Sequence, residues 1–340
     1  MPLQIDTPPA AGPAANVNTS RSRATPQVVV GLINNMPDAA LEGTEAQFRG
    51  LLQAAAGPIS VRLRFSYLPE VPRAPAALEH LSRFYWPLDD LLDGPLDALI
   101  VTGTEPKARV LSEEPYWRPF VRLLEWAEAH TVSSLWSCLA AHAAVEHLDG
   151  VQRQRLERKR FGVFEHRILS GNPLLRGVRD PLHIPHSRWN ELPLSALQSA
   201  GYTIISRSGE TGADLFTKQA RSLLVFCQGH PEYEDTTLLK EYRRDVGRFL
   251  RAEQSHYPTL PCGYFDAEAL ALLSTFQSQA QRQRDPELLS QFPTAALARS
   301  VRATWRPAAT RIYTNWLGII STATASTAPR VISSTTVQQF

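Results

Sequence analysis

Three residues of the types used in nucleophilic catalysis stand at or just after the ends of apolar segments. Cys138 ends the run TVSSLWSC, and an alanine-rich segment with helical character begins immediately after it. His230 and Glu232 follow the apolar run SLLVFC and stand two positions apart. In an extended chain, side chains at i and i+2 point the same way, so the Glu232 carboxylate can orient the His230 imidazole. The second imidazole nitrogen can then take the proton of a thiol, as in a nucleophile–base–orienter triad.

A cysteine at a strand-to-helix turn has two physical properties that favour catalysis. The positive end of the helix dipole favours the thiolate, and backbone N–H groups at the turn can hold an oxyanion. The alternative is that Cys138 is a buried filler, because free cysteine packs as a small hydrophobe. We interpret Cys227 and Cys262 in that second way.

The segments around these residues predict an α/β fold. Apolar runs typical of strands alternate with amphipathic helical patterns, the strands over 28–33, 61–68, 96–103 and 131–138 and the helices over 44–56, 116–130 and 139–148. This alternation implies crossover units and a mainly parallel sheet flanked by helices in three layers. In such sheets functional groups collect at the carboxyl ends of strands, where Gly103, Cys138 and His230 fall.

Composition shifts divide the chain into one domain and two tails. Residues 1–26 are rich in proline, alanine and small polar residues and predict a disordered tail. We expect a single domain over 27–321, with helical C-terminal additions and a polar helical insertion near 262–305 that is peripheral and builds no second core. The Ser/Thr-rich end over 322–340 predicts a second disordered tail.

Charge and composition argue against several functional classes. The 340 residues are 43% hydrophobic with a formal net charge of +2, so no overall field attracts nucleic acid or lipid. No segment has the length of a membrane span or the apolar core of a signal peptide. Three cysteines without a C-x-x-C pair predict free thiols and a cytoplasmic protein. No histidine other than His230 has a second metal-ligating side chain at a suitable spacing in the sequence, so we expect no metal and no cofactor.

Longer motifs of the chain resemble one protein family. They are NNMP (34–37), TEAQF (44–48), HLSRFYWPLDDL (80–91), LDALIVTGTEP (96–106), YW (116–117), FGVFEH (161–166), PHSR (185–188), GHPEYEDTTLLKEYRRD (229–245) and YTNWL (313–317). GHPEY followed by T-L-x-x-E-Y-x-R-D is far more specific than an H-x-E pair alone. By these motifs the chain is identified as a member of the homoserine O-acyltransferases of the succinyltransferase type. These enzymes act in methionine synthesis, and their fold is similar to that of class I glutamine amidotransferases.

The resemblance implies roles for particular residues. Cys138 would be the acyl-accepting nucleophile of a ping-pong mechanism, His230 the general base and Glu232 its orienter. The co-substrates would be an acyl-CoA and homoserine, with the backbone N–H of Leu139 and one from the loop after Gly103 stabilising the oxyanion.

Substrate-binding residues are carried over in the same way. Lys159 and Ser187 match pocket residues of the family, and Arg244 matches an arginine near the amino-acid substrate. A guanidinium is a natural clamp for an α-carboxylate, and the alternative for Arg244 is a surface ion pair with Asp245 or Glu241. The family is commonly dimeric, so the resemblance also implies a homodimer.

Several positions depart from the family pattern. Leu139 and His142 replace the usual Trp and Gln after the nucleophile, and MPDAALEGTE lacks a lysine that the family carries near its active site. An ungapped match places Lys107 at the position that discriminates succinyl from acetyl donors. A lysine there would suit a succinyl carboxylate, and the alternative is a lysine in solvent. Serine, one methylene shorter than homoserine, is the alternative acceptor, because one methylene is worth only ~1–3 kcal/mol in a pocket.

Two other functions remain open at this level. A glutamine amidotransferase or related cysteine hydrolase would have the same fold, but it predicts a G-x-C-x-G elbow where this chain has SCLAA. A catalytically inactive paralogue that binds a ligand or partner would be expected only if the triad were broken. Cys138, His230 and Glu232 are all present, which favours the acyltransferase.

Overall fold

The structure, a computed structural model, describes residues 2–8, 27–169 and 171–327. Its centre is a sheet of eight strands in the described part of the chain, in the order β1-β3-β2-β4-β5-β12-β11-β8. The strands are β1 (Leu3–Ile5), β2 (Gln27–Ile33), β3 (Ser60–Ser66), β4 (Ala98–Thr102), β5 (Ser133–Ser137), β8 (Thr203–Ile204), β11 (Leu215–Gln219) and β12 (Leu223–Cys227). From β1 through β12 in this order, neighbouring strands are parallel, whereas β11 pairs antiparallel with both β12 and β8.

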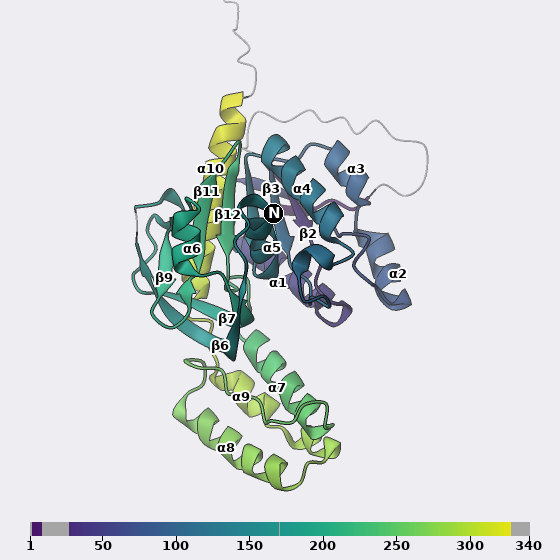
Figure 1. Cartoon of the computed structure of the whole chain (residues 1–340), viewed down its shortest axis with the longest axis vertical. Coiled ribbons are helices and arrows are strands. Elements are labelled where there is room, and N and C mark those ends of the chain that lie inside the picture. The colour runs from purple at the N-terminus through teal and green to yellow at the C-terminus, as the bar shows by residue number, and fades with distance from the viewer. Residues whose placement is uncertain (1, 9–26, 170, 328–340) are drawn as a thin grey trace, which may run out of the picture.

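Helices cover both faces of this sheet. In β2, Val28 and Val30 pack into one apolar cluster and Val29 and Ile33 into the other, because alternate residues of a strand point to opposite faces. The first cluster is completed by α1 (Leu41–Ala55), α2 (Pro75–Phe84) and α10 (Arg306–Thr327), and the second by α3 (Leu88–Asp93), α4 (Trp117–His130), α5 (Leu139–Asp149) and α6 (Leu194–Ser199). The predicted three-layer α/β fold is confirmed (Figure 1).

A second, antiparallel sheet lies beside the first one. Its order is β10-β9-β6-β7, with β6 (Gln154–Ile168) and β7 (Leu182–Glu191) as its long strands and β9 (Ser206–Ser208) and β10 (Gly212–Ala213) as short ones. A register shift interrupts the β6–β7 pairing between Arg155 and Arg160. This irregularity places Lys159 outside the regular ladder, on the strand pair that also carries Ser187.

The helices between the last sheet strand and α10 form a separate lobe, at the bottom of Figure 1. They are α7 (Thr237–Leu250), α8 (Ala267–Arg282) and α9 (Thr294–Ser300), with a short 3-10 helix, η4, over Pro286–Gln291. The insertion is peripheral as expected, but the expectation that it builds no second core is wrong. Tyr242, Leu273 and Trp305 are fully buried in an apolar cluster of this lobe. The core was not evident in the polar sequence because α8 buries only a narrow stripe of its surface, formed by Ala269, Leu273, Phe276 and Ala280.

Regular secondary structure occurs in part of each segment that was predicted to be a disordered tail. Leu3–Ile5 pairs in parallel with β3, and the Val61 N–H donates to the Pro2 carbonyl at 2.6 Å. A strand of three residues is too short to show a period in sequence, whereas the exposed edge of β3 offers it hydrogen-bond partners. At the other end, α10 continues to Thr327. The remaining parts of the tails, 9–26 and 328–340, lie outside the described residues.

None of the helices in the described ranges has the length and apolar character needed to cross a membrane. The homodimer and the cytoplasmic location stay predictions.

Candidate active site

Cys138 sits on a sharp turn between β5 and α5. Its φ of 52° and ψ of −112° are strained for a residue with a side chain, and α5 begins at the next residue. The Cys138 N–H donates to the Cys227 carbonyl at 2.7 Å, which ties the turn to neighbouring β12. The thiol is therefore presented at the carboxyl edge of the parallel strands, as in a nucleophile elbow.

His230 and Glu232 follow β12, the strand next to β5. His230 Nδ1 lies 2.8 Å from Glu232 Oε1, and the two side chains are almost completely buried. The imidazole also stacks on the Tyr233 ring at a centroid distance of 4.4 Å. The predicted geometry of the pair is present, and it leaves Nε2 of the imidazole for the thiol.

Two negative partners favour the protonated form of His230. Burial is the largest single influence and lowers the pKa of His230. The charges of Cys138 and Glu232, with hydrogen bonds to both, outweigh it and raise this pKa well above its ordinary value. An imidazolium held against a thiolate is the activated form of a cysteine nucleophile.

The loop after β4 touches the start of α5 beside this pair. A Cβ atom on Gly103 would lie 2.4 Å from Leu139 Cβ and 3.0 Å from Ala140 N, so only glycine permits this approach. The first N–H groups of a helix have no acceptor within the helix. The Leu139 N–H and the Gly103 loop are therefore placed where an oxyanion can be held.

Lys159, Ser187 and Arg244 come from β6, β7 and α7, and all three contact carboxylates of α7. Lys159 Nζ lies 3.1 Å from Asp245 Oδ2, and Arg244 Nε lies 2.9 Å from Asp245 Oδ1. Ser187 Oγ donates to Glu241 Oε2. The alternative of an ion pair between Arg244 and Asp245 is thus present, although half of the Arg244 side chain (49%) stays exposed to a ligand.

Glu241 has a central position that the sequence analysis did not assign. Besides the Ser187 hydroxyl, it accepts the Tyr233 hydroxyl at 2.6 Å, and its side chain is only 17% exposed. One signal was available, because Glu241 precedes Arg244 and Asp245 by three and four positions on a predicted helix and so shares their face.

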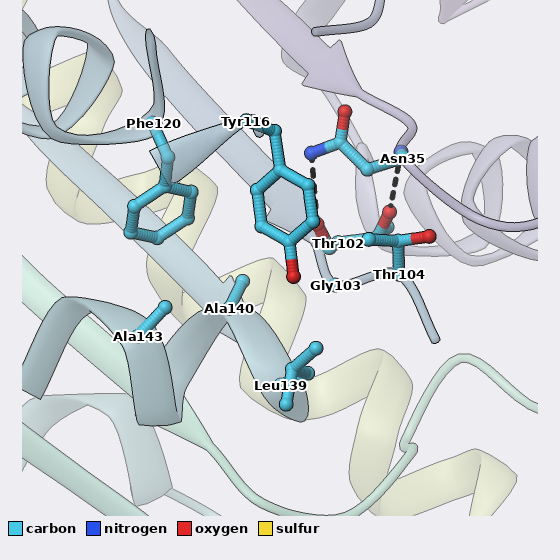
Figure 2. A pocket seen from close by; sticks show the side chains of 9 residues that line it. All are labelled: Asn35, Thr102, Gly103, Thr104, Tyr116, Phe120, Leu139, Ala140 and Ala143. Atoms are coloured by element: carbon cyan, nitrogen blue, oxygen red, sulfur yellow. Dashed lines mark hydrogen bonds between the residues drawn. The ribbon is translucent and has the colours of Figure 1, made fainter. Parts of the chain in front are cut away.

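Lys107 does not line the cavity beside the nucleophile. Its side chain is exposed, while its backbone N–H donates to Glu114 Oε1 at 2.6 Å. The cavity residues, shown in Figure 2, are Asn35, Thr102, Gly103, Thr104, Tyr116, Phe120, Leu139, Ala140 and Ala143. Of the two readings of Lys107, the structure favours a lysine in solvent, and the acyl-specificity role stays a prediction.

Comparison with known proteins identifies the family of this chain. The sequence model of the family Homoserine O-succinyltransferase matches residues 14–326. The chain belongs to this family. A homoserine O-succinyltransferase of Rhodopseudomonas palustris is 45% identical over 297 residues, covering 87% of this chain and 89% of that protein. One of Bradyrhizobium japonicum is 41% identical over 314 residues, covering 92% and 95%. A glutamine amidotransferase structure from Thermotoga maritima has a TM-score of 0.47 at 12% identity, covering 86% and 98%.

Within this homoserine O-succinyltransferase family member, His142 occupies the position one turn after the nucleophile. It is 2% exposed, and its Nε2 lies 3.0 Å from Gln228 Oε1. Burial, reinforced by the charge of Arg188, lowers the pKa of His142 to about 3. The side chain is therefore a neutral hydrogen-bond partner of Gln228 at neutral pH.

The lowered pKa of His142 predicts that the free energy of unfolding falls as the pH is lowered. The unfolded chain takes up a proton on His142 below pH ~6.5, whereas the folded chain does not until about pH 3, so acid favours unfolding. We expect wild type to lose about 2 kcal/mol more than His142→Gln between about pH 7 and 5. Urea unfolding at both pH values measures it, with the exposed His256→Gln as the matched control. Equal losses in all three proteins would contradict the assignment.

A buried cluster of His166, His186 and Asp214 lies behind the site, with ligand atoms within 4.8 Å of one another. The expectation that these histidines have no other metal-ligating side chain near them is wrong, because the fold brings together strands that are distant in sequence. Hydrogen bonds already use the nitrogens, since Arg188 Nε donates to His186 Nδ1 at 3.2 Å and the two histidine Nε2 atoms are 3.3 Å apart. The residue before His230 donates its N–H to Asp214 Oδ1 at 2.7 Å. We interpret the cluster as support for the His230 segment.

Proposed function

We propose that this chain transfers a succinyl group from succinyl-CoA to the hydroxyl of homoserine through a thioester on Cys138. The observation that carries the proposal is the activated pair, in which the strained Cys138 elbow faces a His230 whose pKa is raised well above its ordinary value. Membership of the homoserine O-succinyltransferase family supplies the substrate class. The same products would place the enzyme in methionine biosynthesis.

The first half-reaction forms the acyl-enzyme. The Cys138 thiolate attacks the thioester carbonyl, and the resulting oxyanion is held by the Leu139 N–H and the Gly103 loop. The carbonyl re-forms, the carbon–sulfur bond to CoA breaks, and the leaving thiolate takes the proton of His230. The products are free CoA and a succinyl thioester on Cys138, with a neutral imidazole beside it.

The second half-reaction uses that neutral imidazole as a base. His230 takes the hydroxyl proton of homoserine as its oxygen attacks the Cys138 thioester, and Glu232 stabilises the imidazolium that forms. Collapse of the intermediate breaks the bond to sulfur and releases O-succinylhomoserine. The thiolate–imidazolium pair is then restored, so the cycle needs no metal or redox group.

The charged residues around Ser187 suit a zwitterionic acceptor. In our proposal Arg244 binds the α-carboxylate, while Lys159 and Ser187 line the same site. Glu241 and Asp245 supply the negative charge that an α-ammonium group requires. A substrate with both charges can displace the internal ion pairs without leaving a charge unpaired.

The test combines two donors with two acceptors. Purified protein is assayed with succinyl-CoA or acetyl-CoA and with L-homoserine or L-serine, following free CoA thiol and product mass. We expect the highest kcat/KM with succinyl-CoA and homoserine. Faster turnover with acetyl-CoA or serine would overturn the donor or the acceptor assignment, and CoA release that is independent of any acceptor would indicate a hydrolase.

The tight approach at Gly103 predicts a sensitive position. Gly103→Ala places a Cβ 2.4 Å from Leu139 Cβ, which forces the loop away from α5 and misplaces the oxyanion donors. We expect kcat/KM to fall about 100-fold, since shifts near 1 Å have effects of that size. Gly43→Ala is the matched control, because a Cβ on Gly43 meets nothing within 4 Å. A Gly103→Ala enzyme as active as this control would contradict the oxyanion assignment.

A further inference from the structure

Strand β7 leads from the surroundings of His230 to the protein surface. The Pro185 carbonyl accepts the His230 N–H at 2.8 Å, so the strand passes directly beside the proposed base. Pro185, Ser187 and Trp189 share one face of the strand, because alternate residues point the same way. Along this face Pro185 is buried, Ser187 is half-buried and Trp189 is 44% exposed. This face of β7 therefore connects the surroundings of the base with solvent.

Trp189 presents an aromatic plane at the outer end of this face. It is the most exposed of the tryptophans that the structure describes, although tryptophan is highly buried on average. The Arg155 guanidinium of the paired strand β6 lies 4.7 Å from the centroid of its ring. Nucleotide bases stack on exposed aromatic rings and on the planes of arginine side chains, so the pair suits a ligand that contains a base.

Arginines of β6 lie next to this ring. The pairing of β6 with β7 is interrupted between Arg155 and Arg160, and the residues of this interval lie opposite Trp189. Arg158 belongs to this interval and is exposed, as is Arg155. Neither forms an ion pair with a carboxylate of the described residues. Two guanidinium groups beside Trp189 are therefore open to an anionic ligand.

The carboxylates nearby leave the positive charge in excess. Glu157 is the acidic residue of segment 153–160, which carries five basic residues. Glu191, on the paired strand, lies 3.7 Å from the guanidinium of Arg188 and is partly neutralised there. A ligand with several negative charges is therefore attracted to the surface around Trp189.

We propose that the nucleotide end of the acyl-CoA donor binds at this surface, with its adenine ring on Trp189 and its phosphates at Arg155 and Arg158. This inference rests on the proposed function and adds the binding site for the part of the donor that does not react. The charges are complementary, because CoA carries a diphosphate and a 3′-phosphate, and guanidinium groups bind phosphate oxygens in pairs.

The shape of the donor fits the path along β7. Four residues of strand separate Pro185 from Trp189, a distance of about 13 Å. The pantetheine arm of CoA joins the thioester to the phosphates, so it is the part of the donor that covers this distance. The arm passes the acceptor side of Ser187, and CoA leaves before homoserine reacts in the proposed mechanism. The donor and the acceptor therefore use this face in turn.

A donor without the nucleotide tests the proposal. Succinyl-pantetheine keeps the thioester and the arm but lacks the adenine and the phosphates at issue. Rates of Cys138 acylation are measured against donor concentration by rapid quench and intact-protein mass, for wild type, Trp189→Ala and the double variant Arg155→Gln/Arg158→Gln. We expect half-saturation by succinyl-CoA to need about tenfold more donor in each variant, at an unchanged maximal rate. The rates with succinyl-pantetheine should stay at the wild-type values.

Salt and a distant arginine supply the controls. Added salt should slow wild type with succinyl-CoA at low donor concentration more than it slows the double variant, because salt screens the phosphate contacts. Arg207→Gln, which removes an exposed arginine from β9, should leave every rate at the wild-type value.

The other outcomes contradict specific statements. Equal losses with both donors, or a lower maximal rate alone, would show that the variants disturb the reacting centre. Unchanged half-saturation by succinyl-CoA would show that the nucleotide binds elsewhere. These results overturn this inference and leave the proposed function intact. A wild-type protein that gains no succinyl group from either donor would overturn the proposed function itself.

Discussion

Replacing Cys138 with alanine is expected to remove acyl transfer completely. The thioester intermediate needs this sulfur, and no other thiol occupies the site, since Cys227 is buried and Cys262 lies next to Gly162 of the second sheet. We expect turnover to fall by about four orders of magnitude or more. Intact-protein mass after mixing with succinyl-CoA should show one added succinyl group on wild type and none on Cys138→Ala.

The control for this experiment is Cys262→Ser. Cys262 is the exposed cysteine, so it is the thiol with which a donor would react nonspecifically. The Cys262→Ser protein should gain one succinyl group at the wild-type rate. An adduct that survives in Cys138→Ala but disappears in Cys262→Ser would place the acyl group on the wrong cysteine and refute the mechanism.

The second large effect is expected from His230→Gln. Glutamine keeps a hydrogen-bonding group beside Glu232 but can neither carry the positive charge nor accept the proton of homoserine. We expect kcat/KM to fall by about 10²–10⁴, the usual contribution of a general base, with more lost if the thiolate is no longer formed. Single-turnover acylation and steady-state transfer together measure both half-reactions.

The pH dependence of Cys138 alkylation distinguishes an ion pair between Cys138 and His230 from packing of the two side chains alone. Because the pKa of His230 is raised well above its ordinary value, its imidazolium persists through neutral pH and loses its proton only as pH rises through that raised value. In wild type, alkylation of Cys138 by iodoacetamide should therefore be fast at neutral pH, where the His230 imidazolium stabilises the thiolate. In His230→Gln it should become slow and require alkaline pH. His256→Gln, an exposed histidine variant, should behave as wild type; an identical pH profile in all three proteins would rule out the ion pair.

Features that depend on local sequence were predictable. The strand over 28–33 is an unbroken apolar run, and the elbow at Cys138 joins two segments that each show their own period. His230 and Glu232 stand two positions apart on an extended segment, so their contact needs no knowledge of the rest of the fold. Such contacts follow from backbone geometry within a few residues.

Features that join distant segments were not predictable in the same way. Glu241 contacts Ser187 across 54 positions, and the buried Tyr116 hydroxyl has no hydrogen-bond partner among the residues that the structure describes. The match to the family left two alternatives for Lys107, the acyl pocket or solvent, and its side chain is exposed. In each case the surroundings of the side chain depend on strand order and on the path of a loop. The local periodicity of apolar residues carries no information about either.

The sequence by itself determined the α/β fold class and the family, and it predicted the nucleophile with its base and orienter. These depend on the period of apolar residues and on motifs whose members are close in sequence. The tertiary structure decided the buried core of the helical lobe, the contacts of Ser187 and Lys159 with carboxylates of α7, the histidine cluster behind His230 and the burial of the Tyr116 hydroxyl. Those depend on which surfaces meet when the strands align, because burial and hydrogen-bond satisfaction are properties of the whole packed chain.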